Sequence, residues 1–257
     1  MFEANFTVHN VVTLFLTGAE IAALGALLNM NEEELLAKAR DAQNTNLSYY
    51  YYVTGVPCAG KSTALSCLRS FTTYDEWLDA RLPDMSKWPR PLPKKRVDEI
   101  DAWVGRQFAQ KNQMLVHPSE NTRIGIHVLD RCMLDPMSFK RKAERKQRAK
   151  TLLDAVCGNK RQADIQDGMI ILLEGDATIV GERCIAAGKE FSNEQLKEMQ
   201  KVLGNAYRGR GVFLIDARRH THSEVIRSIV RQVFVGRYQT LNIKRRLEDI
   251  EKGKFTW

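Results

Sequence analysis

One short stretch constrains this chain more than any other. "GVPCAGKS", residues 55–62, places glycine at Gly55 and Gly60, followed at once by Lys61 and Ser62. The β-prone run "YYYYVTG" leads into it, and "KSTALSCLRSF", with helical spacing of apolar residues, follows it. Glycines at this spacing let the backbone turn its N–H groups inward around an anion, and the following helix adds its positive dipole end. The stretch therefore predicts a phosphate-binding turn between a strand and a helix.

We expect this turn to hold the phosphates of ATP together with Mg²⁺. The Lys61 side chain can reach the β- and γ-phosphates, and the Ser62 hydroxyl is a ligand for Mg²⁺. The predicted nucleotide-binding residues are Gly55, Val56, Pro57, Cys58, Ala59, Gly60, Lys61, Ser62 and Thr63. Two alternatives stay open. The turn can be a plain glycine turn with an incidental lysine, and Cys58 can be either a tolerated small residue or a reactive thiol.

Apolar strands and amphipathic helices alternate along the rest of the chain. "RIGIHVLDR", "GMIILLEGD" and "GVFLID" have the character of strands, and helical patterns separate them. This alternation predicts a parallel sheet covered on both faces, hence a three-layer α/β/α domain over residues 48–235. Residues 1–47 are expected to form an N-terminal helical extension, either a plain helical hairpin or a helix-turn-helix. Residues 236–257 are expected to form a basic C-terminal helix or tail.

The net charge and the spacing of the cysteines limit the expected binding partners and the expected cellular compartment. The formal net charge is +8, and the positive charge is concentrated at residues 140–150 and 242–254. Such a balance suits phosphorylated small molecules or nucleic acid. The five cysteines form no C-x-x-C pair, which favours reduced thiols in the cytoplasm over disulfides or a zinc site. No apolar run approaches the roughly 20 residues that span a bilayer, so no membrane partner is expected.

Asp130 and Arg131 follow a predicted buried strand directly. The carboxyl ends of strands in an open α/β sheet carry the ligand site, so both side chains are expected beside the phosphate turn. Asp130 is a candidate ligand of Mg²⁺, and Arg131 is a candidate partner for a phosphate of the second substrate. The alternative is a surface ion pair that closes the strand.

Two further groups of charged residues are candidates on weaker grounds. Asp75 and Glu76 follow the expected second strand, where a carboxylate can accept a hydroxyl proton or bind a sugar hydroxyl; the alternative is a capped surface helix. Arg183 and Lys189 follow the strand "MIILLE" and can close over a transferring phosphate, whose charge spreads over its oxygens. The alternative for these two cations is a solvated helix face.

A basic helix is expected over residues 140–150. Arg141, Arg145 and Arg148 are spaced by four and three residues, so they share one face of such a helix. Arg141 and Arg145 are therefore candidate ligands for the phosphate of an acceptor. A solvated basic helix is the alternative.

The order of these motifs resembles that of the thymidylate kinase and deoxynucleoside kinase group of P-loop kinases. "GVPCAGKST" is similar to their phosphate loop, and "LDRCMLDPMSF" to their Asp-Arg segment. "IILLEGDATIVGERCIAAGKEF" is similar to their strand, helix and lid, and "GVFLIDARRHTHSEVIRSIV" to their closing strand and helix. The resemblance covers roughly residues 48–235, and the phosphate loop is its one specific motif.

This resemblance implies roles for particular residues. It gives phosphate and Mg²⁺ binding to Lys61 and Ser62, Mg²⁺ binding to Asp130, acceptor-phosphate binding to Arg131, and a mobile lid to Arg183 and Lys189. The sequence departs from the family's pattern at three points. Cys132 replaces a tyrosine or serine, Asp176-Ala177 stands where Pro-Glu is common, and Asp75-Glu76 replaces Glu-Pro. These departures affect the expected identity of the acceptor more than the expected binding of ATP.

These observations lead to one favoured function and two alternatives. The favoured one is an ATP- and Mg²⁺-dependent phosphotransferase that acts on a nucleotide or nucleoside, with a (deoxy)nucleoside monophosphate as the preferred acceptor. Its catalytic residues would be Lys61, Asp130, Arg131 and Arg183, and a homodimer stays open. The first alternative is a nucleic-acid-binding P-loop ATPase or polynucleotide end kinase, which the basic runs favour. The second is a degenerate kinase fold that serves as a nucleotide-gated interaction module.

Overall fold

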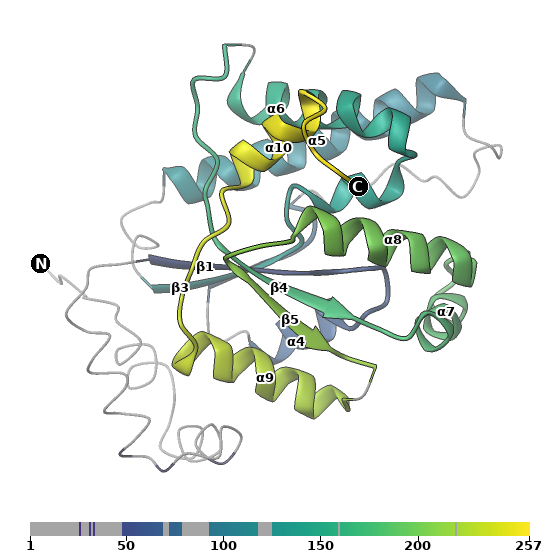
Figure 1. Ribbon diagram of the computed structural model, residues 1–257. Coiled ribbons are helices and arrows are strands. Elements are labelled where there is room, and N and C mark those ends of the chain that lie inside the picture. Colours follow the sequence, from purple (N-terminus) through teal and green to yellow (C-terminus); the bar gives the residue numbers. More distant parts are fainter. Residues whose placement is uncertain are drawn as a thin grey trace, which may run out of the picture.

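Five parallel strands form the central sheet of the computed structural model (Figure 1). The structure describes residues 48–68, 72–78, 93–117, 125–158, 160–218 and 220–257, together with Ala26, Asn31 and Glu33. The strands are β1 (Ser48–Gly55), β2 (Thr72–Tyr74), β3 (Gly125–Asp130), β4 (Met169–Glu174) and β5 (Val212–Asp216). Their order across the sheet is β2-β3-β1-β4-β5, with every neighbouring pair parallel. All five carboxyl ends therefore meet at one edge, where open α/β sheets bind ligands.

Helices cover both faces of this sheet. They are α4 (Lys61–Cys67), α5 (Lys94–Val116), α6 (Arg145–Cys157), α7 (Ala177–Ala186), α8 (Asn193–Ala206), α9 (His222–Val235) and α10 (Ile243–Glu251), with the 3-10 turns η3 (Asp135–Phe139) and η4 (Lys142–Glu144). Figure 1 shows α5, α6, α8 and α10 on one face and α4 and α9 on the other. The predicted three-layer α/β/α fold is confirmed.

The tyrosine run of β1 forms the middle of the sheet. The hydroxyl groups of these tyrosines donate hydrogen bonds to residues on both faces of the sheet. Residues 50–53 are buried, and the Tyr50 and Tyr52 hydroxyls donate to the carbonyl oxygens of Leu115 and Gln166 at 3.4 and 2.7 Å. The Tyr51 hydroxyl donates to Val233 O, on the opposite face, at 3.3 Å. Successive side chains of a strand point to opposite faces, so the tyrosines anchor both helical layers to the strand that carries the phosphate turn.

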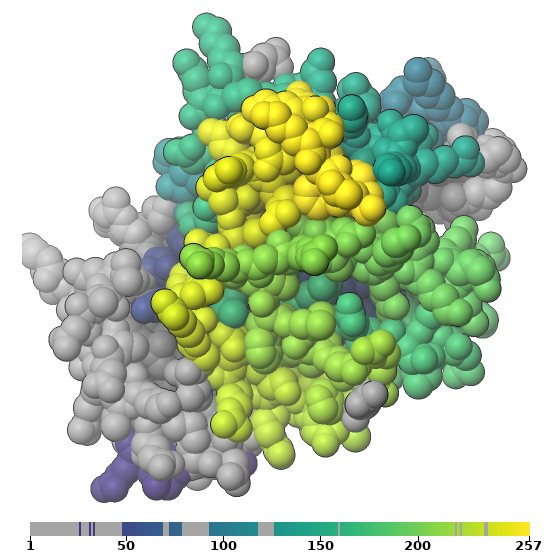
Figure 2. Space-filling model, in the orientation of Figure 1, coloured from purple at the N-terminus to yellow at the C-terminus, as the bar shows by residue number. Residues whose placement is uncertain are grey.

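The C-terminal segment packs against the domain. α10 lies on α6, and Figure 2 shows the last residues filling the surface between α6 and α8. The Trp257 ring lies under the Arg145 guanidinium, 4.4 Å from centroid to Cζ, and contacts Phe255 edge-on. The prediction of an N-terminal helical extension over residues 1–47 falls almost entirely outside the described residues. In the described part of the chain no helix has the length and apolarity needed to cross a membrane.

Candidate active site

The phosphate turn leaves β1 at Gly55 and enters α4 at Lys61. Gly55 and Gly60 have φ angles of 145° and 97°, and Cys58 has φ 59°, so three of its residues occupy the region that L side chains rarely adopt. A Cβ on Gly55 would meet the carbonyl oxygen of Leu173 on β4 at 2.7 Å. Glycine is therefore required at this position by backbone conformation and by the close approach of β4.

Lys61 folds back over this turn. Its Nζ donates to the carbonyl oxygens of Gly55 at 3.1 Å and Val56 at 2.8 Å. Lys61 is 4% exposed, and burial, with the nearby positive charge of Arg131, lowers its pKa to about 8. An ammonium group has three protons to donate, so the two bonds leave one for a phosphate oxygen held by the turn.

Ser62 and Asp130 form a pair of oxygen donors next to Lys61. The Ser62 Oγ donates to Asp130 Oδ2 at 3.1 Å, while Asp130 Oδ1 is buried and has no hydrogen-bond partner among the described residues. Burial raises the pKa of the Asp130 carboxyl, and the charges of Lys61 and Arg131 oppose that shift. A buried carboxylate oxygen without a donor is the kind of ligand that a divalent cation completes.

The residues at this point fit Mg²⁺ better than a metal held entirely by protein. Among the described residues no group of three or more His, Cys, Asp or Glu side chains could hold a metal ion. Mg²⁺ in nucleotide sites keeps waters and phosphate oxygens and takes only one or two protein ligands. The hydroxyl of Ser62 and the free Oδ1 of Asp130 supply that number.

Arg131, directly after β3, contacts two carboxylates. One belongs to Glu76 in the segment after β2, and the other belongs to the buried Asp135. The Nε of Arg131 lies 2.5 Å from Glu76 Oε1, and its Nη1 lies 3.4 Å from Asp135 Oδ2. Its backbone has φ 66°, and its N–H donates to Val53 O on β1 at 3.0 Å. The guanidinium is thus fixed between two carboxylates, of which Asp135 is buried and Glu76 is partly exposed.

Asp135 is a residue that the sequence did not single out. It is 1% exposed and accepts hydrogen bonds from the Thr54 and Tyr207 hydroxyls. Burial raises the pKa of its carboxyl, and the positive charge of Arg131 opposes this effect. The one signal in the sequence was its position four residues after Arg131, which suits an ion pair within a helical turn.

Lys111 is the second residue that the sequence did not single out. It lies on α5, 2% exposed, and its Nζ donates to the carbonyl oxygens of Asp75, Glu76 and Asp130 at 2.6, 3.0 and 3.2 Å. Burial lowers its pKa to about 8. All three ammonium protons are engaged, so Lys111 acts as a fixed tie between the segment after β2 and the end of β3.

A cavity of about 350 Å³ opens beside these residues. Its lining residues are Ser62, Leu65, Ser66, Thr73, Asp75, Glu76, Trp77 and Asp130. Three carboxylates face it, and none of the described residues that line it is a lysine or arginine. Trp77 closes one side and packs against Trp103, with ring centroids 4.7 Å apart. The cavity is therefore acidic, with one aromatic wall.

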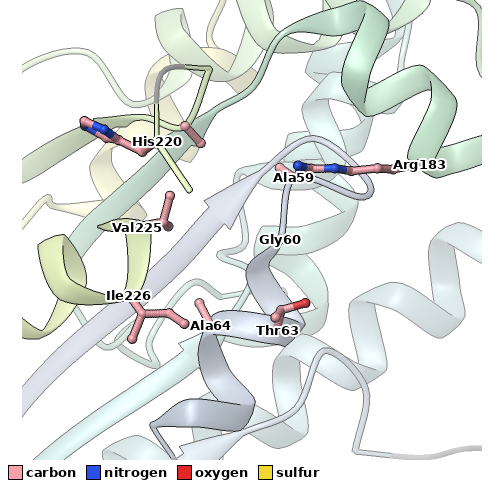
Figure 3. Close-up of a pocket in the computed structure, with 9 residues that line it drawn as sticks. Ala59, Gly60, Thr63, Ala64, Arg183, His220, Val225 and Ile226 are labelled. Carbon is pink, nitrogen blue, oxygen red and sulfur yellow. The ribbon is translucent and has the colours of Figure 1, made fainter. Parts of the chain in front are cut away.

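A much smaller cleft of about 10 Å³ lies on the other side of α4. Its lining residues are Ala59, Gly60, Thr63, Ala64, Arg183, Ala217, His220, Val225 and Ile226. Figure 3 shows the Arg183 side chain reaching from α7 toward Ala59 of the turn. Positions 60, 63 and 64 face this cleft, whereas 62, 65 and 66 face the acidic cavity. The turn and its helix therefore separate two sites, one of them next to Arg183.

The remaining predicted residues lie elsewhere. Lys189 is exposed, just after the Gly188 turn that ends α7, and lines neither cavity. Asp176 caps α7 by accepting from the N–H groups of Thr178 and Ile179, which explains the departure from Pro-Glu in structural terms.

The basic helix also differs from its expected arrangement. Arg141 precedes η4, so it is not on α6 with the other two arginines. Arg145 is buried and donates to Lys140 O and Glu198, and Arg148 is buried and paired with Asp101. None of these three arginines lines the acidic cavity. The ion pairs with Glu198 and Asp101 hold Arg145 and Arg148 between helices instead.

Comparisons with known proteins find similarity in fold rather than in sequence. No protein-family model matches the chain, and no curated protein matches its sequence. Two solved structures of deoxyadenosine kinase from M. mycoides are similar to it. One, with the products dCMP and a flexible dCDP bound, has 16% identity and a TM-score of 0.52. The other, with bound dATP, has 15% identity and a TM-score of 0.54. Each match covers 72% of this chain and 98% of that chain. The chain therefore has the fold of a P-loop kinase.

Proposed function

We propose that this protein transfers the γ-phosphoryl group of ATP, with Mg²⁺, to a hydroxyl group of a nucleoside. The observation that carries the proposal is the acidic cavity beside Lys61, Ser62 and Asp130. One side of the phosphate turn offers cations and backbone N–H groups to a nucleotide. The other side offers carboxylates to an acceptor that carries no charge.

The charge of the cavity argues for a nucleoside over a nucleoside monophosphate. A phosphate group held near 4 Å from a carboxylate meets a repulsion of about 4 kcal/mol per pair of unit charges near a protein surface. Asp75, Glu76 and Asp130 face the cavity, and the nearby Arg131 is already paired with Glu76 and Asp135. The sequence favoured a monophosphate acceptor, with Arg131, Arg141 and Arg145 on its phosphate. The ion pairs of Arg131 with Glu76 and Asp135, and of Arg145 with Glu198, support the uncharged acceptor instead.

Glu76 is the residue best placed to receive the proton of the acceptor hydroxyl. Its carboxylate lines the cavity, and its bond to Arg131 fixes its direction. A general base of this kind contributes about 10²- to 10⁴-fold to a rate. Asp75, one residue earlier, lines the same cavity and is a candidate for binding a sugar hydroxyl.

The donor side works by charge and position. Lys61 and the N–H groups of the turn bind the phosphates, and Ser62 and Asp130 would hold Mg²⁺, which neutralises the charge that builds up on the phosphate oxygens. Arg183, on α7 beside Ala59, is placed to stabilise the same charge from the opposite side. Phosphoryl transfer needs positioning and charge neutralisation more than covalent chemistry, so these groups suffice.

The solved structures support the proposal in two respects. The similar proteins are named as deoxyadenosine kinases, and one of them holds dATP.

For the alternative of a nucleic-acid partner, the basic segment 140–150 offers fewer free positive charges than its sequence suggested. Lys140 and Arg148 are both paired with Asp101, and Arg145 is paired with Glu198.

A direct assay separates the proposals. The full chain is incubated with Mg-ATP and, in parallel, with nucleosides, deoxynucleosides, their monophosphates and a 5′-hydroxyl oligonucleotide, and the ADP and phosphorylated products are measured. We expect product from nucleosides. Product from monophosphates alone would favour the monophosphate acceptor that the sequence indicated. Product from the oligonucleotide alone would favour an end kinase. Product from none of them would refute the transfer reaction. Lys61→Ala is the negative control.

A further inference from the structure

Two of the five cysteines meet where the phosphate turn touches α7. Cys58 is the half-buried residue in the middle of the turn, and Cys184 is buried on α7. The Cys184 Sγ lies 3.8 Å from Pro57 O, the carbonyl oxygen of the peptide group that carries Cys58. The two side chains are near enough that Cys58 helps to raise the pKa of the Cys184 thiol. The sequence, in which the two residues are far apart, gave no sign of this pair.

We propose that Cys58 and Cys184 form a reversible disulfide that ties the phosphate turn to α7. The other described cysteines do not compete for either partner. Cys132 and Cys157 are buried, and Cys67 is exposed on α4. The proposal concerns a modification site, and it stands whatever reaction the protein performs.

The two thiols differ in the role they can take. Cys58 reaches solvent, so it can meet an oxidant such as glutathione disulfide. Burial, together with the neighbouring Cys58, raises the pKa of the Cys184 thiol to about 11, and the charges of Lys189 and Lys61 oppose that shift. Because Cys58 is accessible and Cys184 is buried, Cys58 meets the oxidant first and Cys184 reacts second.

The exchange balances without any further reactant. The Cys58 thiolate attacks one sulfur of glutathione disulfide, which forms a mixed disulfide and releases one glutathione. Cys184 then gives up its proton and attacks the Cys58 sulfur, which breaks the mixed disulfide and releases the second glutathione. The two protein thiols are oxidised to one disulfide, and one glutathione disulfide is reduced to two thiols.

The bond would change the geometry of the turn. Sulfur atoms in a disulfide lie about 2.05 Å apart in a specific geometry, so the bond would fix the separation between Cys58 and α7. The flanking N–H groups and Lys61 would shift with Cys58, and Arg183 would shift with α7. Because a displacement of about 1 Å can cost about 100-fold in rate, we expect the oxidised protein to lose phosphoryl transfer by about that factor.

The bond itself is tested without any activity assay. The reduced full chain is incubated with glutathione disulfide, remaining thiols are alkylated, and the protein is digested without reductant for mass spectrometry. We expect a linked pair of peptides that contain Cys58 and Cys184, and its loss on treatment with dithiothreitol. A stable glutathione adduct on Cys58 with Cys184 alkylated, a link between Cys58 and Cys67, or no link would each overturn the proposal.

Variants then test the consequence. In Cys184→Ser, and in Cys184→Ala as a second replacement, the exchange should stop at the mixed disulfide, so peptide mass mapping should find one glutathione retained on Cys58. The wild type should retain none, lose about 100-fold in transfer and recover it with dithiothreitol. Cys67→Ser is the matched control and should remain as sensitive as the wild type. A wild type that retains glutathione on Cys58 to the same extent as the Cys184 variants would show that Cys184 does not resolve the mixed disulfide, and would overturn the proposal. Binding of a fluorescent ATP analogue by the oxidised chain gives a readout that does not require transfer.

Discussion

Arg131 Nε lies 2.5 Å from Glu76 Oε1, and this bond joins the end of β3 to the segment that follows β2. Glu76 lines the acidic cavity, and Arg131 holds its Oε1. Arg131 cannot turn away, because its other edge faces the buried Asp135. Arg131 therefore fixes the orientation of a carboxylate at the edge of the cavity.

Replacing Glu76 by glutamine should remove the base and keep the bond to Arg131. Glutamine still accepts a hydrogen bond but cannot take up a proton, so kcat should fall about 10²- to 10⁴-fold with a small change in KM for the nucleoside. Steady-state kinetics measure both. Glu99→Gln, at an exposed ion pair with Arg96 on α5, is the matched control and should leave kcat unchanged. A wild-type kcat in Glu76→Gln would exclude Glu76 as the base.

Asp130→Asn should weaken the use of Mg²⁺. The substitution removes the negative charge beside Ser62 and changes the unpartnered Oδ1 position, so the Mg²⁺ concentration for half-maximal rate should rise about tenfold or more. Titration with Mg²⁺ at fixed ATP measures it, and chelation with EDTA should stop transfer by the wild type reversibly. The exposed Asp98→Asn on α5 should titrate like the wild type. An unchanged Mg²⁺ titration in Asp130→Asn would remove Asp130 from the metal site.

The pKa of Lys61 predicts an alkaline limit to nucleotide capture. A pKa of about 8 means that Lys61 is charged below pH 8 in the free enzyme and loses its charge as the pH rises above that value. The ratio kcat/KM for Mg-ATP reports the free enzyme, so it should fall about tenfold per pH unit above the pKa. Bound phosphates favour the charged form, so kcat should fall less.

A Lys61→Arg enzyme tests this assignment. Arginine stays charged over the whole range, so the variant should lose rate but show no alkaline limb in kcat/KM. Lys111 has a similar pKa of about 8 and is the other candidate. An alkaline limb that persists in Lys61→Arg would therefore assign the titration to a different group.

Lys111→Met should destabilise the fold as well as the site. The substitution leaves the carbonyl oxygens of Asp75, Glu76 and Asp130 without their buried donor. A buried polar group without a partner costs about 1–3 kcal/mol, so the free energy of unfolding should fall by about 3 kcal/mol or more. Urea denaturation measures it, and Lys95→Met, exposed on the same helix, should change stability little. Equal stability of the two variants would contradict the role given to Lys111.

The parts of the molecule that the sequence predicted are those with a local signal. The glycines of "GVPCAGKS", the alternation of strands and helices, and the Asp-Arg pair at the end of β3 each have a pattern that can be recognised within a few residues. The three-layer fold follows from them, and so does the meeting of Ser62 with Asp130, because parallel strands bring their carboxyl ends to one edge.

The parts that the sequence missed depend on contacts between distant segments. Lys111 looks like an ordinary helical lysine until α5 packs over the ends of β2 and β3. Arg145 has the spacing of a substrate ligand, yet Glu198 on α8 and the ring of Trp257 enclose it. The Cys58–Cys184 neighbourhood likewise requires α7 to lie on the turn. Spacing along the chain indicates which residues share a face, but only packing decides what that face meets.

The proposed transfer of a phosphoryl group to an uncharged acceptor is tested most directly by one competition experiment. The protein is given Mg-ATP labelled in its γ-phosphate, with a deoxynucleoside and its monophosphate at equal concentration. We expect the label to enter the monophosphate newly made from the deoxynucleoside, and Lys61→Ala to abolish this product. Label that enters the diphosphate instead, or appears only as inorganic phosphate, would contradict it.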